Sequence, residues 1–406
     1  MPRNILVLTA GYVGVPQFGG CPRIYNFFQH LPSNYHLFYY TIHTYGNFDE
    51  AKQNAIREIL LKKMKIRKFQ YKMIPIKYNK FGKLLHKLSF QPYFYEGLRR
   101  KKYFKDIKRF IDHFCRDNNI SLIYAGSLEA TQFCFGNSLP LISDVHDAIS
   151  LLAKRSANFE KYPIKKLKLL SESYCIKRYE SRCCKESNFY IVNSSEDEKY
   201  LSKFLDNAKL RIIENGVDFS YFRYRFNREM KNKILVFTGD MSYSPNEDAA
   251  LYFSNRIFPV LRDRYTGLLF NIVGKNPPQR LKKLENKPGI TVKGFVKDIR
   301  PHIHEAVAYV SPLRYGTGMK NKILESMALG TPVLASPISC EGISVNHEDN
   351  ILIANNEEEY TQWIEQLILN NNLRKRLSEN AYTMVKKHYN WTEKSQQLQN
   401  LIETVI

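Results

Sequence analysis

The chain has 406 residues, 44% of them apolar, which is more than one hydrophobic core usually holds and predicts two domains of roughly 200 residues. Its seven cysteines include no Cys-x-x-Cys pair, and its first apolar run is too short for a secretory or membrane-spanning segment, so we expect reduced thiols in the cytosol rather than disulfides or zinc. The net charge of +22 at pH 7 is unevenly spread, which directs attention to anionic partners.

The N-terminal half begins with a buried strand that leads into a glycine loop. Residues 4–10 form an apolar run of strand length, and the loop that follows contains the pair Gly19 and Gly20. Residues 22–31 have the pattern of a helix. A glycine loop between a strand and a helix is weak evidence for a ligand contact by itself.

A strongly basic stretch follows at residues 61–110, with 17 Lys or Arg against Glu96 and Asp106. Basic side chains alternate there with aromatic ones, a combination that suits the surface of an anionic membrane. Two other interpretations stay open, a solvated basic face and single-stranded nucleic acid. Because no nucleic-acid-binding module is recognisable, we expect an anionic membrane surface as the partner of 61–110 and no nucleic acid.

Two later strands are expected in the same half, at residues 121–126 and 139–144. The second strand leads directly into His146 and Asp147. This turn predicts either a histidine that faces a ligand or a surface histidine beside a helix-capping aspartate.

The domain junction is expected between a helix at 194–204 and an Asn-Gly turn at 214–218. We therefore predict an N-terminal domain at 1–207 and a C-terminal domain at 208–390, followed by a last segment at 391–406. Buried strand runs alternate with helical segments in the C-terminal domain, which predicts a doubly wound parallel sheet. The strand runs are residues 234–239, 271–274 and 292–296.

The most informative segment, residues 311–333, has the pattern of a strand end, a glycine loop, a short helix and another strand. Gly316 and Gly318 allow backbone conformations that a side chain would block. The loop opens a helix whose free N–H groups and positive dipole end suit a phosphate, and two lysines beside it strengthen that preference. Glu325, one turn further on, can accept hydrogen bonds from a ribose diol. The segment predicts a pocket for a nucleotide diphosphate.

The same segment resembles the donor-binding motif of GT-B glycosyltransferases, in particular the retaining enzymes of family 4. Their pattern K-x-L-E-x-M-A-x-G-x-P-V is matched at Lys322, Glu325, Met327, Ala328, Gly330, Pro332 and Val333. The resemblance implies an α/β fold of two Rossmann-like domains that face a cleft, with 391–406 crossing back to the first domain. It implies that Glu325 holds the ribose and that His146 approaches the transferred sugar. The implied donor-binding residues are Gly19, Gly20, Gly239, Lys275, Gly294, Phe295, Val296, Arg314, Gly316, Thr317, Gly318, Met319 and Glu325.

The chemistry implied by this resemblance needs no metal, because no Asp-x-Asp occurs in the chain. A metal-free enzyme stabilises the departing diphosphate with cations, N–H groups and helix ends. We expect Lys320 and Lys322 to supply the charge, with Lys275 and Arg314 behind them, and no cofactor beyond the donor substrate. His146 would position the sugar, since the donor phosphate removes the acceptor proton.

The sequence departs from the family pattern at two places. Thr317 stands where family members carry a first glutamate that contacts the donor sugar. Asp240 and Met241 follow the first strand of the C-terminal domain, where an arginine and a lysine are common. These departures prevent a prediction of which sugar the donor carries.

The overall prediction is a glycosyltransferase that moves a sugar from a nucleotide diphosphate to a lipid-linked or cell-surface glycan, at the inner face of the plasma membrane. Two alternatives remain at this point. One is a non-hydrolysing nucleotide-sugar epimerase, which shares the architecture but carries catalytic carboxylates that we do not find. The other is a catalytically degenerate basic binding protein.

Overall fold

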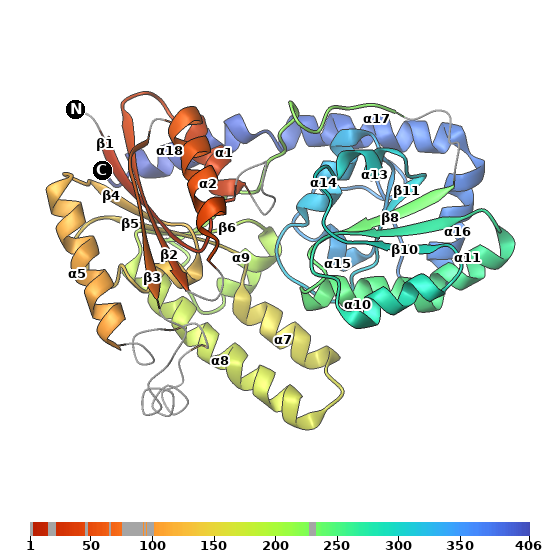
Figure 1. Ribbon diagram of the computed structural model, residues 1–406, viewed down its shortest axis with the longest axis horizontal. Helices are drawn as coiled ribbons and strands as arrows, with labels where there is room; N and C mark the ends of the chain where they lie inside the picture. The colour runs from red at the N-terminus through yellow and green to blue at the C-terminus, as the bar shows by residue number, and fades with distance from the viewer. Residues whose placement is uncertain are drawn as a thin grey trace. The chain divides into compact units, whose positions relative to one another are not determined.

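The computed structural model describes residues 3–14, 22–44, 48–64, 66–74, 92, 95, 101–226 and 233–406. The chain divides into two compact units, one formed by residues 1–214 with 391–406 and the other by residues 215–390. Each unit is built around its own parallel sheet with helices on both faces (Figure 1). This confirms the predicted α/β class and the two Rossmann-like domains.

The first unit contains a seven-stranded sheet in the order β3-β2-β1-β4-β5-β6-β7, and all neighbouring strands are parallel. The strands are β1 (Arg3–Ala10), β2 (Tyr35–Thr44), β3 (Ile66–Ile74), β4 (Leu122–Ala125), β5 (Leu141–His146), β6 (Phe189–Val192) and β7 (Leu210–Ile212). The helices are α1 (Arg23–Gln29), α2 (Glu50–Lys63), α5 (Lys101–Asp117), α6 (Leu128–Thr131), α7 (Ile149–Phe159), α8 (Pro163–Glu186), α9 (Ser195–Leu201) and α18 (Trp391–Glu403).

The middle of strand β1, residues 5–8, is a continuous apolar run that is buried on both faces of the sheet. Ile5 and Val7 belong to a core shared with α1, α2 and α18, whereas Leu6 and Leu8 belong to a core shared with α5. Successive side chains of a strand point to opposite faces, so a strand covered on both faces needs apolar residues at every position.

The boundary between the units lies further along the chain than the predicted junction at 207/208. Strand β7 (Leu210–Ile212) pairs in register with β6 of the first sheet, which keeps the chain in the first unit as far as Glu214. The three-residue strand was not expected, because it is too short to show a periodic pattern.

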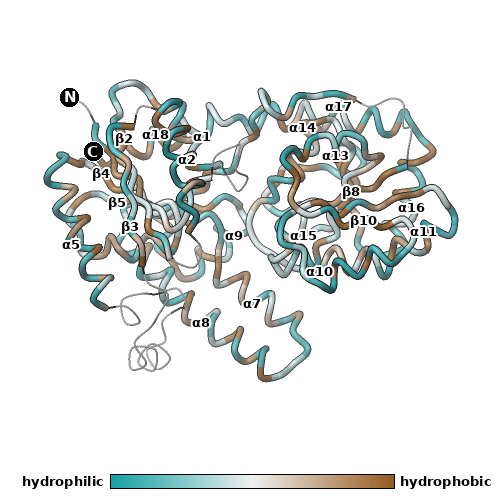
Figure 2. Tube along the Cα trace, viewed as in Figure 1, coloured by the Kyte–Doolittle hydropathy of each residue, from teal (hydrophilic) through white to brown (hydrophobic). Residues whose placement is uncertain are grey.

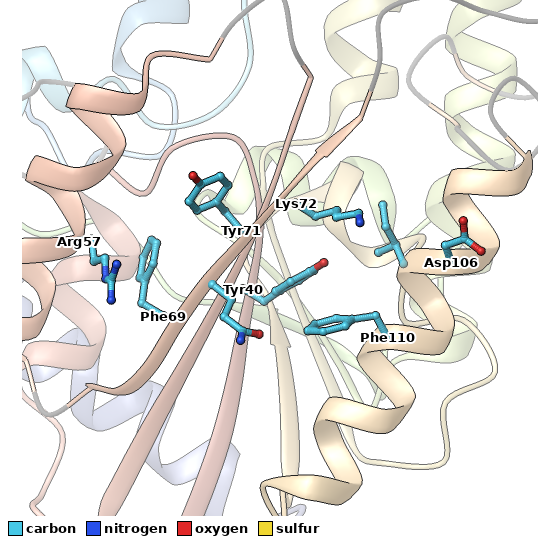
Figure 3. Close-up of a pocket in the computed structure, with 9 residues that line it drawn as sticks. Tyr40, Arg57, Phe69, Tyr71, Lys72, Asp106 and Phe110 are labelled. Atoms are coloured by element: carbon cyan, nitrogen blue, oxygen red, sulfur yellow. The ribbon is translucent and has the colours of Figure 1, made fainter.

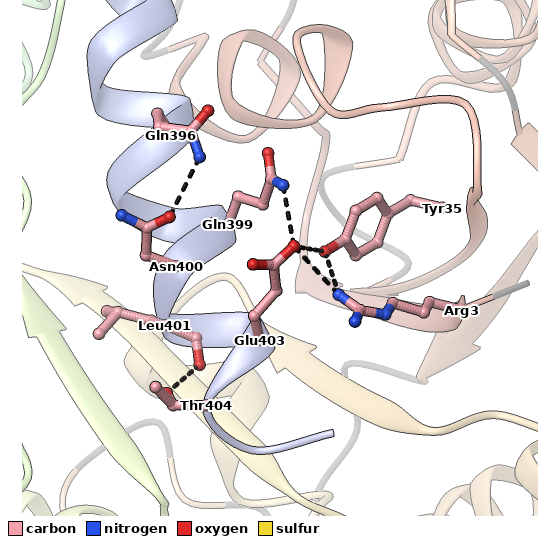
Figure 4. Close-up of polar contacts among 8 residues, drawn as sticks. All are labelled: Arg3, Tyr35, Gln396, Gln399, Asn400, Leu401, Glu403 and Thr404. Atoms are coloured by element: carbon pink, nitrogen blue, oxygen red, sulfur yellow. Dashed lines mark hydrogen bonds and ion pairs between the residues drawn. The ribbon is translucent and has the colours of Figure 1, made fainter. Parts of the chain in front are cut away.

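The last helix, α18, packs within the first unit. The Trp391 ring meets the Phe27 ring edge-on at a centroid distance of 5.4 Å. Near the other end of α18, the Glu403 carboxylate accepts hydrogen bonds of 3.1 Å from both Arg3 and Tyr35 (Figure 4). The helix is thereby tied to β1 and β2, the first two strands of the chain.

The second unit contains a six-stranded parallel sheet in the order β10-β9-β8-β11-β12-β13. The strands are β8 (Ile234–Thr238), β9 (Leu269–Val273), β10 (Ile290–Lys293), β11 (Ala308–Ser311), β12 (Val333–Ala335) and β13 (Leu352–Ile353). The helices are α10 (Ser244–Tyr252), α11 (Phe258–Arg264), α12 (Gln279–Lys282), α13 (Arg300–His304), α14 (Asn321–Leu329), α15 (Pro337–Cys340), α16 (Glu357–Leu369) and α17 (Asn371–His388), with a π-turn at Phe253–Ile257 and a 3₁₀ turn at Lys283–Asn286.

The strand order of the second sheet reverses between β8 and β11. Strand β9 pairs with β8 on one side and β11 pairs with it on the other, so the connections leave in opposite directions. Ligands of open α/β sheets bind at such a reversal, outside the carboxyl ends of the strands. The loops that start at Gly239 and Pro312 are therefore the first place to look for a site.

Within the described residues, none of the helices combines the length and the apolar character that crossing a bilayer requires.

Candidate functional site

Lys322 lies in the first turn of α14, and its ammonium reaches back to the end of β8. The Nζ atom donates a hydrogen bond of 2.6 Å to Oδ1 of Asn246 and one of 3.3 Å to the carbonyl oxygen of Thr238. It also lies 4.3 Å from the centroid of the Phe237 ring. Burial, and next the charge of Lys320, lower the pKa of Lys322 from 10.5 to about 7. An anion placed beside this lysine would raise its pKa again.

Glu325 lies one helical turn beyond Lys322 on α14. Its carboxylate accepts no hydrogen bond from any residue that the structure describes, although the side chain is half-buried. Burial raises the pKa of Glu325 to about 7, and the charge of Lys322 opposes that rise. A partly buried carboxylate without a donor costs free energy, and a ligand with hydroxyl groups would remove that cost.

The glycine loop before α14 is held by Lys320. Its Nζ donates to the carbonyl oxygens of Thr317 and Gly318, at 3.2 and 2.6 Å. Gly318 has a φ of 70°, in the left-handed region where glycine is favoured. The structure thus gives the Lys320 ammonium two loop carbonyls as partners, and its predicted contact with a diphosphate remains a prediction.

Thr317 occupies the position where the family pattern has a glutamate. Its hydroxyl oxygen is buried, and no hydrogen-bond partner for it exists among the described residues. An orphaned buried hydroxyl is uncommon in folded proteins and needs an explanation. A ligand that offers a donor or acceptor at this loop would supply one.

The ends of β8 and β9 approach each other so closely that only glycine fits. A Cβ on Gly274 would lie 1.7 Å from the carbonyl oxygen of Gly239, and a Cβ on Gly239 would lie 2.7 Å from Nδ2 of Asn246. Asn246 is the same residue that accepts from Lys322. The absence of a side chain at Gly239 therefore leaves room for the amide that holds the lysine.

The two cations expected behind Lys320 and Lys322 are paired with carboxylates. Lys275 forms an ion pair of 3.3 Å with Asp240, and Arg314 forms a two-pronged ion pair with Asp248. Each cation thus has a carboxylate partner within the protein, and its role as a further charge for a diphosphate stays a prediction. Asp240 stands where family members commonly carry a cation.

Gly294, Phe295 and Val296 follow the end of β10, two strands away from the reversal point. A Cβ on Gly294 would meet nothing within 4 Å, and Phe295 is 68% exposed. Val296 packs against the core of the second unit. The resemblance implies that the backbone of this turn contacts the base of the donor, and this contact remains a prediction.

His146 lies in the first unit, at the end of β5. Its backbone has a φ of 69°, and its Nε2 lies 3.2 Å from the carbonyl oxygen of Gly126. Beneath it, the fully buried Asp144 accepts a 2.7 Å hydrogen bond from Arg23 and another from Tyr124. These contacts hold the end of β5 rigidly. The predicted Gly19 and Gly20 lie outside the described residues.

The first unit has a cavity of about 430 Å³ beside its edge strand β3 (Figure 3). Its lining includes Tyr40, Phe69, Lys72, Asp106 and Phe110. Part of the basic stretch 61–110 thus borders a hollow with aromatic and charged walls. Arg99 and Arg100, which belong to the same stretch, lie outside the described residues.

Sequence reasoning missed Asn246 as a site residue. The available signal was Pro245 in the first turn of the helix that follows β8, since proline is favoured at that position. A polar residue next to such a proline, at the carboxyl end of a strand, points toward the ligand edge of the sheet. Among the described residues, no cluster of His, Cys, Asp and Glu has the arrangement of a metal site.

Comparison with known proteins agrees with this geometry. Residues 232–370 match the family described as Glycosyl transferases group 1. An uncharacterized glycosyltransferase of Methanocaldococcus jannaschii is 26% identical over 53% of this chain and 59% of its own length. An uncharacterized 44.6 kDa protein in the cps region of Klebsiella pneumoniae is 22% identical over 40% of this chain and 44% of its own length. The chain thus spans about half the length of these curated relatives.

Solved structures resemble the chain over nearly its whole length. The structure of TarM from S. aureus superposes on this chain with a TM-score of 0.70 at 13% sequence identity. The match covers 99% of this chain and 99% of TarM. HepE of Anabaena, solved in complex with UDP and glucose, has a TM-score of 0.65 at 14% identity, over 99% of this chain and 100% of HepE. The chain therefore has the GT-B fold, and its residues 232–370 belong to the glycosyl transferases group 1 family.

Proposed function

We propose that the protein is a retaining glycosyltransferase that takes a sugar from a nucleotide diphosphate donor bound by the second unit. The observation that carries this proposal is Glu325, a half-buried carboxylate that accepts no hydrogen bond from the described residues, one turn from the half-buried Lys322. A ribose diol supplies the donors that Glu325 lacks, and a diphosphate supplies the charge that Lys322 lacks.

The proposed transfer depends on charge stabilisation by the protein and on no metal ion. The diphosphate would lie at the N-terminus of α14, which no side chain caps, and Lys322 would neutralise the charge that develops as the sugar leaves. The acceptor hydroxyl would attack from the face that the diphosphate leaves, with the donor phosphate taking its proton. His146 would then position the sugar.

The acceptor in this proposal is a lipid-linked or cell-surface glycan, met at the cytoplasmic face of a membrane. Two similar proteins support this class of acceptor: the Klebsiella relative is encoded in a cps region, and the structural neighbour WaaB is a lipopolysaccharide outer core galactosyltransferase. We propose that the basic stretch 61–110 meets the anionic membrane surface.

The test of the proposed function is a screen of UDP, GDP and ADP, and then of their sugars, by thermal shift. A nucleotide present at 100 times its Kd adds about 2.7 kcal/mol of stability, which is readily seen. The donor that is found should be consumed with the sugar anomer retained, as NMR of the product reports. Glu305→Gln, on an exposed residue of the same unit, is the matched control for variants of Glu325. Failure of every nucleotide to bind would overturn the proposal.

A further inference from the structure

Helices α7 and α8 form an antiparallel hairpin that extends away from the first sheet (Figure 1). The base of the hairpin is built into the unit. Glu180 of α8, which is fully buried, accepts hydrogen bonds from the backbone N–H and the hydroxyl of Ser150, and Ser173 donates 2.8 Å to the Ser150 carbonyl oxygen. The hairpin is therefore a rigidly anchored projection.

The far half of α8 lacks a packed face. Its buried residues begin only at Ser173, and all of residues 161–168 are exposed. Ile164 is 85% exposed and Leu167 is 69% exposed, and Leu170 and Tyr174 continue this line at 40% and 53%. The spacing of three, three and four residues places these side chains on one stripe of the helix. Figure 2 shows apolar positions along α8 out to the tip of the hairpin.

Lysines flank the apolar stripe. Lys161, Lys165, Lys166 and Lys168 all lie within the exposed segment, and Tyr162 at the tip is 65% exposed. The Nζ of Lys165 lies 4.8 Å from the Tyr162 ring centroid. Long lysine side chains can keep their charge at a lipid headgroup while apolar neighbours enter the acyl boundary. An aromatic ring at the tip suits the same boundary.

We propose that the α7–α8 hairpin is a lipid-docking element whose tip enters the headgroup layer of an anionic phospholipid bilayer. A stripe that was only apolar would suit another protein surface equally well. Here four lysines lie within the same eight exposed residues as Ile164 and Leu167, and this composition complements an anionic membrane. The proposal adds an apolar anchor to the membrane contact of the proposed function, and its physical basis does not depend on glycosyl transfer.

The hairpin is distinct from the basic stretch 61–110, but the structure links the two. The Tyr95 ring lies 5.9 Å from the Phe104 ring of α5 and 6.0 Å from the Tyr179 ring of α8. The base of the hairpin and the described end of the basic stretch therefore belong to one packed part of the first unit. Charge would bring the protein to the membrane, and the hairpin would hold it there.

The experiment is co-sedimentation of the full chain with vesicles of phosphatidylcholine and phosphatidylglycerol. Replacing both Ile164 and Leu167 with Asp should lower vesicle partitioning by at least about tenfold. The matched control is Leu369→Asp, since Leu369 is 71% exposed on α16 of the second unit and should leave partitioning unchanged. Because all three positions are exposed, the variants should melt at the wild-type temperature.

A second measurement places the tip in the lipid. Tyr162→Trp adds an indole at the tip, and its fluorescence should shift to the blue and be quenched by brominated lipid only when anionic vesicles are present. Replacing Lys161, Lys165, Lys166 and Lys168 with Glu should weaken vesicle binding by at least about 100-fold.

Two outcomes would overturn the inference. In one, the Ile164 and Leu167 double variant binds vesicles as the wild type does, and charge reversal at 99–102 alone removes binding. In the other, the wild type ignores vesicles and the stripe joins two copies, so the double variant converts a dimer to a monomer in light scattering. Nucleotide binding is measured separately. If nucleotides still raise the melting temperature but the protein does not bind vesicles, the hairpin proposal fails and the nucleotide-sugar site is retained. If the protein binds vesicles through the hairpin but no nucleotide raises the melting temperature, the hairpin proposal is retained and the nucleotide-sugar site fails.

Discussion

The Nζ of Lys322 lies 2.6 Å from Oδ1 of Asn246, although the two residues are 76 positions apart in the sequence. The other amide atom of Asn246 donates 3.0 Å to the carbonyl oxygen of Asp240, which fixes the direction of the oxygen toward the lysine. Three elements, the end of β8, the start of α10 and the start of α14, therefore share one hydrogen-bond network. The half-buried lysine is held in place by these bonds, and preorganised charge is what stabilises a departing anion.

The two lysines of the glycine loop can be separated by mutation. Lys322→Ala should lower turnover by at least about 100-fold, the scale for losing one preorganised donor to a developing anion. Replacement of both Lys320 and Lys322 should cost at least as much. Lys320→Met removes the two bonds to the loop carbonyls, so we expect it to lower thermal stability as well as turnover. EDTA should leave the wild type active, and complete inactivation by the chelator would contradict a metal-free mechanism.

Donor affinity should depend on pH in a bell shape with its maximum near pH 7. Binding needs Glu325 ionised and Lys322 protonated, and burial brings both pKa values to about 7. Below that pH Glu325 takes up a proton and loses acceptor capacity, and above it Lys322 loses its charge. Glu325→Gln should remove the acid limb, and Lys322→Arg should remove the alkaline limb. A nucleotide sugar is the ligand to titrate, because its diphosphate has no group that titrates near neutrality.

Glycine substitutions test the close approach of β8 and β9. Gly274→Ala should destabilise the second unit by at least about 2 kcal/mol, because its Cβ would lie 1.7 Å from the Gly239 carbonyl oxygen. The matched control is Gly294→Ala at the end of the neighbouring strand, where a Cβ meets nothing within 4 Å. Equal unfolding midpoints in urea for the two variants would show that the approach is not as close as described.

The ionisation of Glu325 should cost stability. Because burial raises its pKa to about 7 in the folded state, the folded protein holds this proton over a pH range in which the unfolded chain releases it, and stability falls as pH rises from about 4.5 to about 7. Glu325→Gln avoids this cost. The variant should gain on the wild type by up to about 3 kcal/mol between about pH 5 and about pH 8, as measured by denaturant unfolding. A difference that is constant with pH would place the Glu325 pKa near its ordinary value.

The sequence alone predicted the parts of the site that depend on neighbours in the chain. One such part is the segment around α14. The glycine followed by Thr331 and Pro332 predicted the end of the helix, and Gly330 does end it with a φ of 87°. The alternation of apolar runs and helical segments likewise predicted the two parallel sheets, because strands covered on both faces need continuous apolar runs.

The parts that were not predicted depend on residues far apart in the chain. Arg314 and Asp248 are 66 positions apart, and nothing in either segment shows that the cation is paired with a carboxylate. The hydrogen bond between Lys322 and Asn246 likewise joins residues that are 76 positions apart, so neither segment alone predicts it. The short strand β7 was missed because pairing with β6, rather than its own pattern, makes it a strand. Such features come from tertiary contacts and not from local preference.

The most direct test of the nucleotide-sugar site is calorimetric titration of the nucleoside diphosphate that the screen selects into wild-type protein, Glu325→Ala and Glu305→Gln. Glu325→Ala should weaken binding by roughly 1.5–3 kcal/mol, the scale for hydrogen bonds to a charged group, and Glu305→Gln should leave it unchanged. Identical affinities for all three proteins would remove Glu325 from the site and contradict the proposed nucleotide-sugar binding.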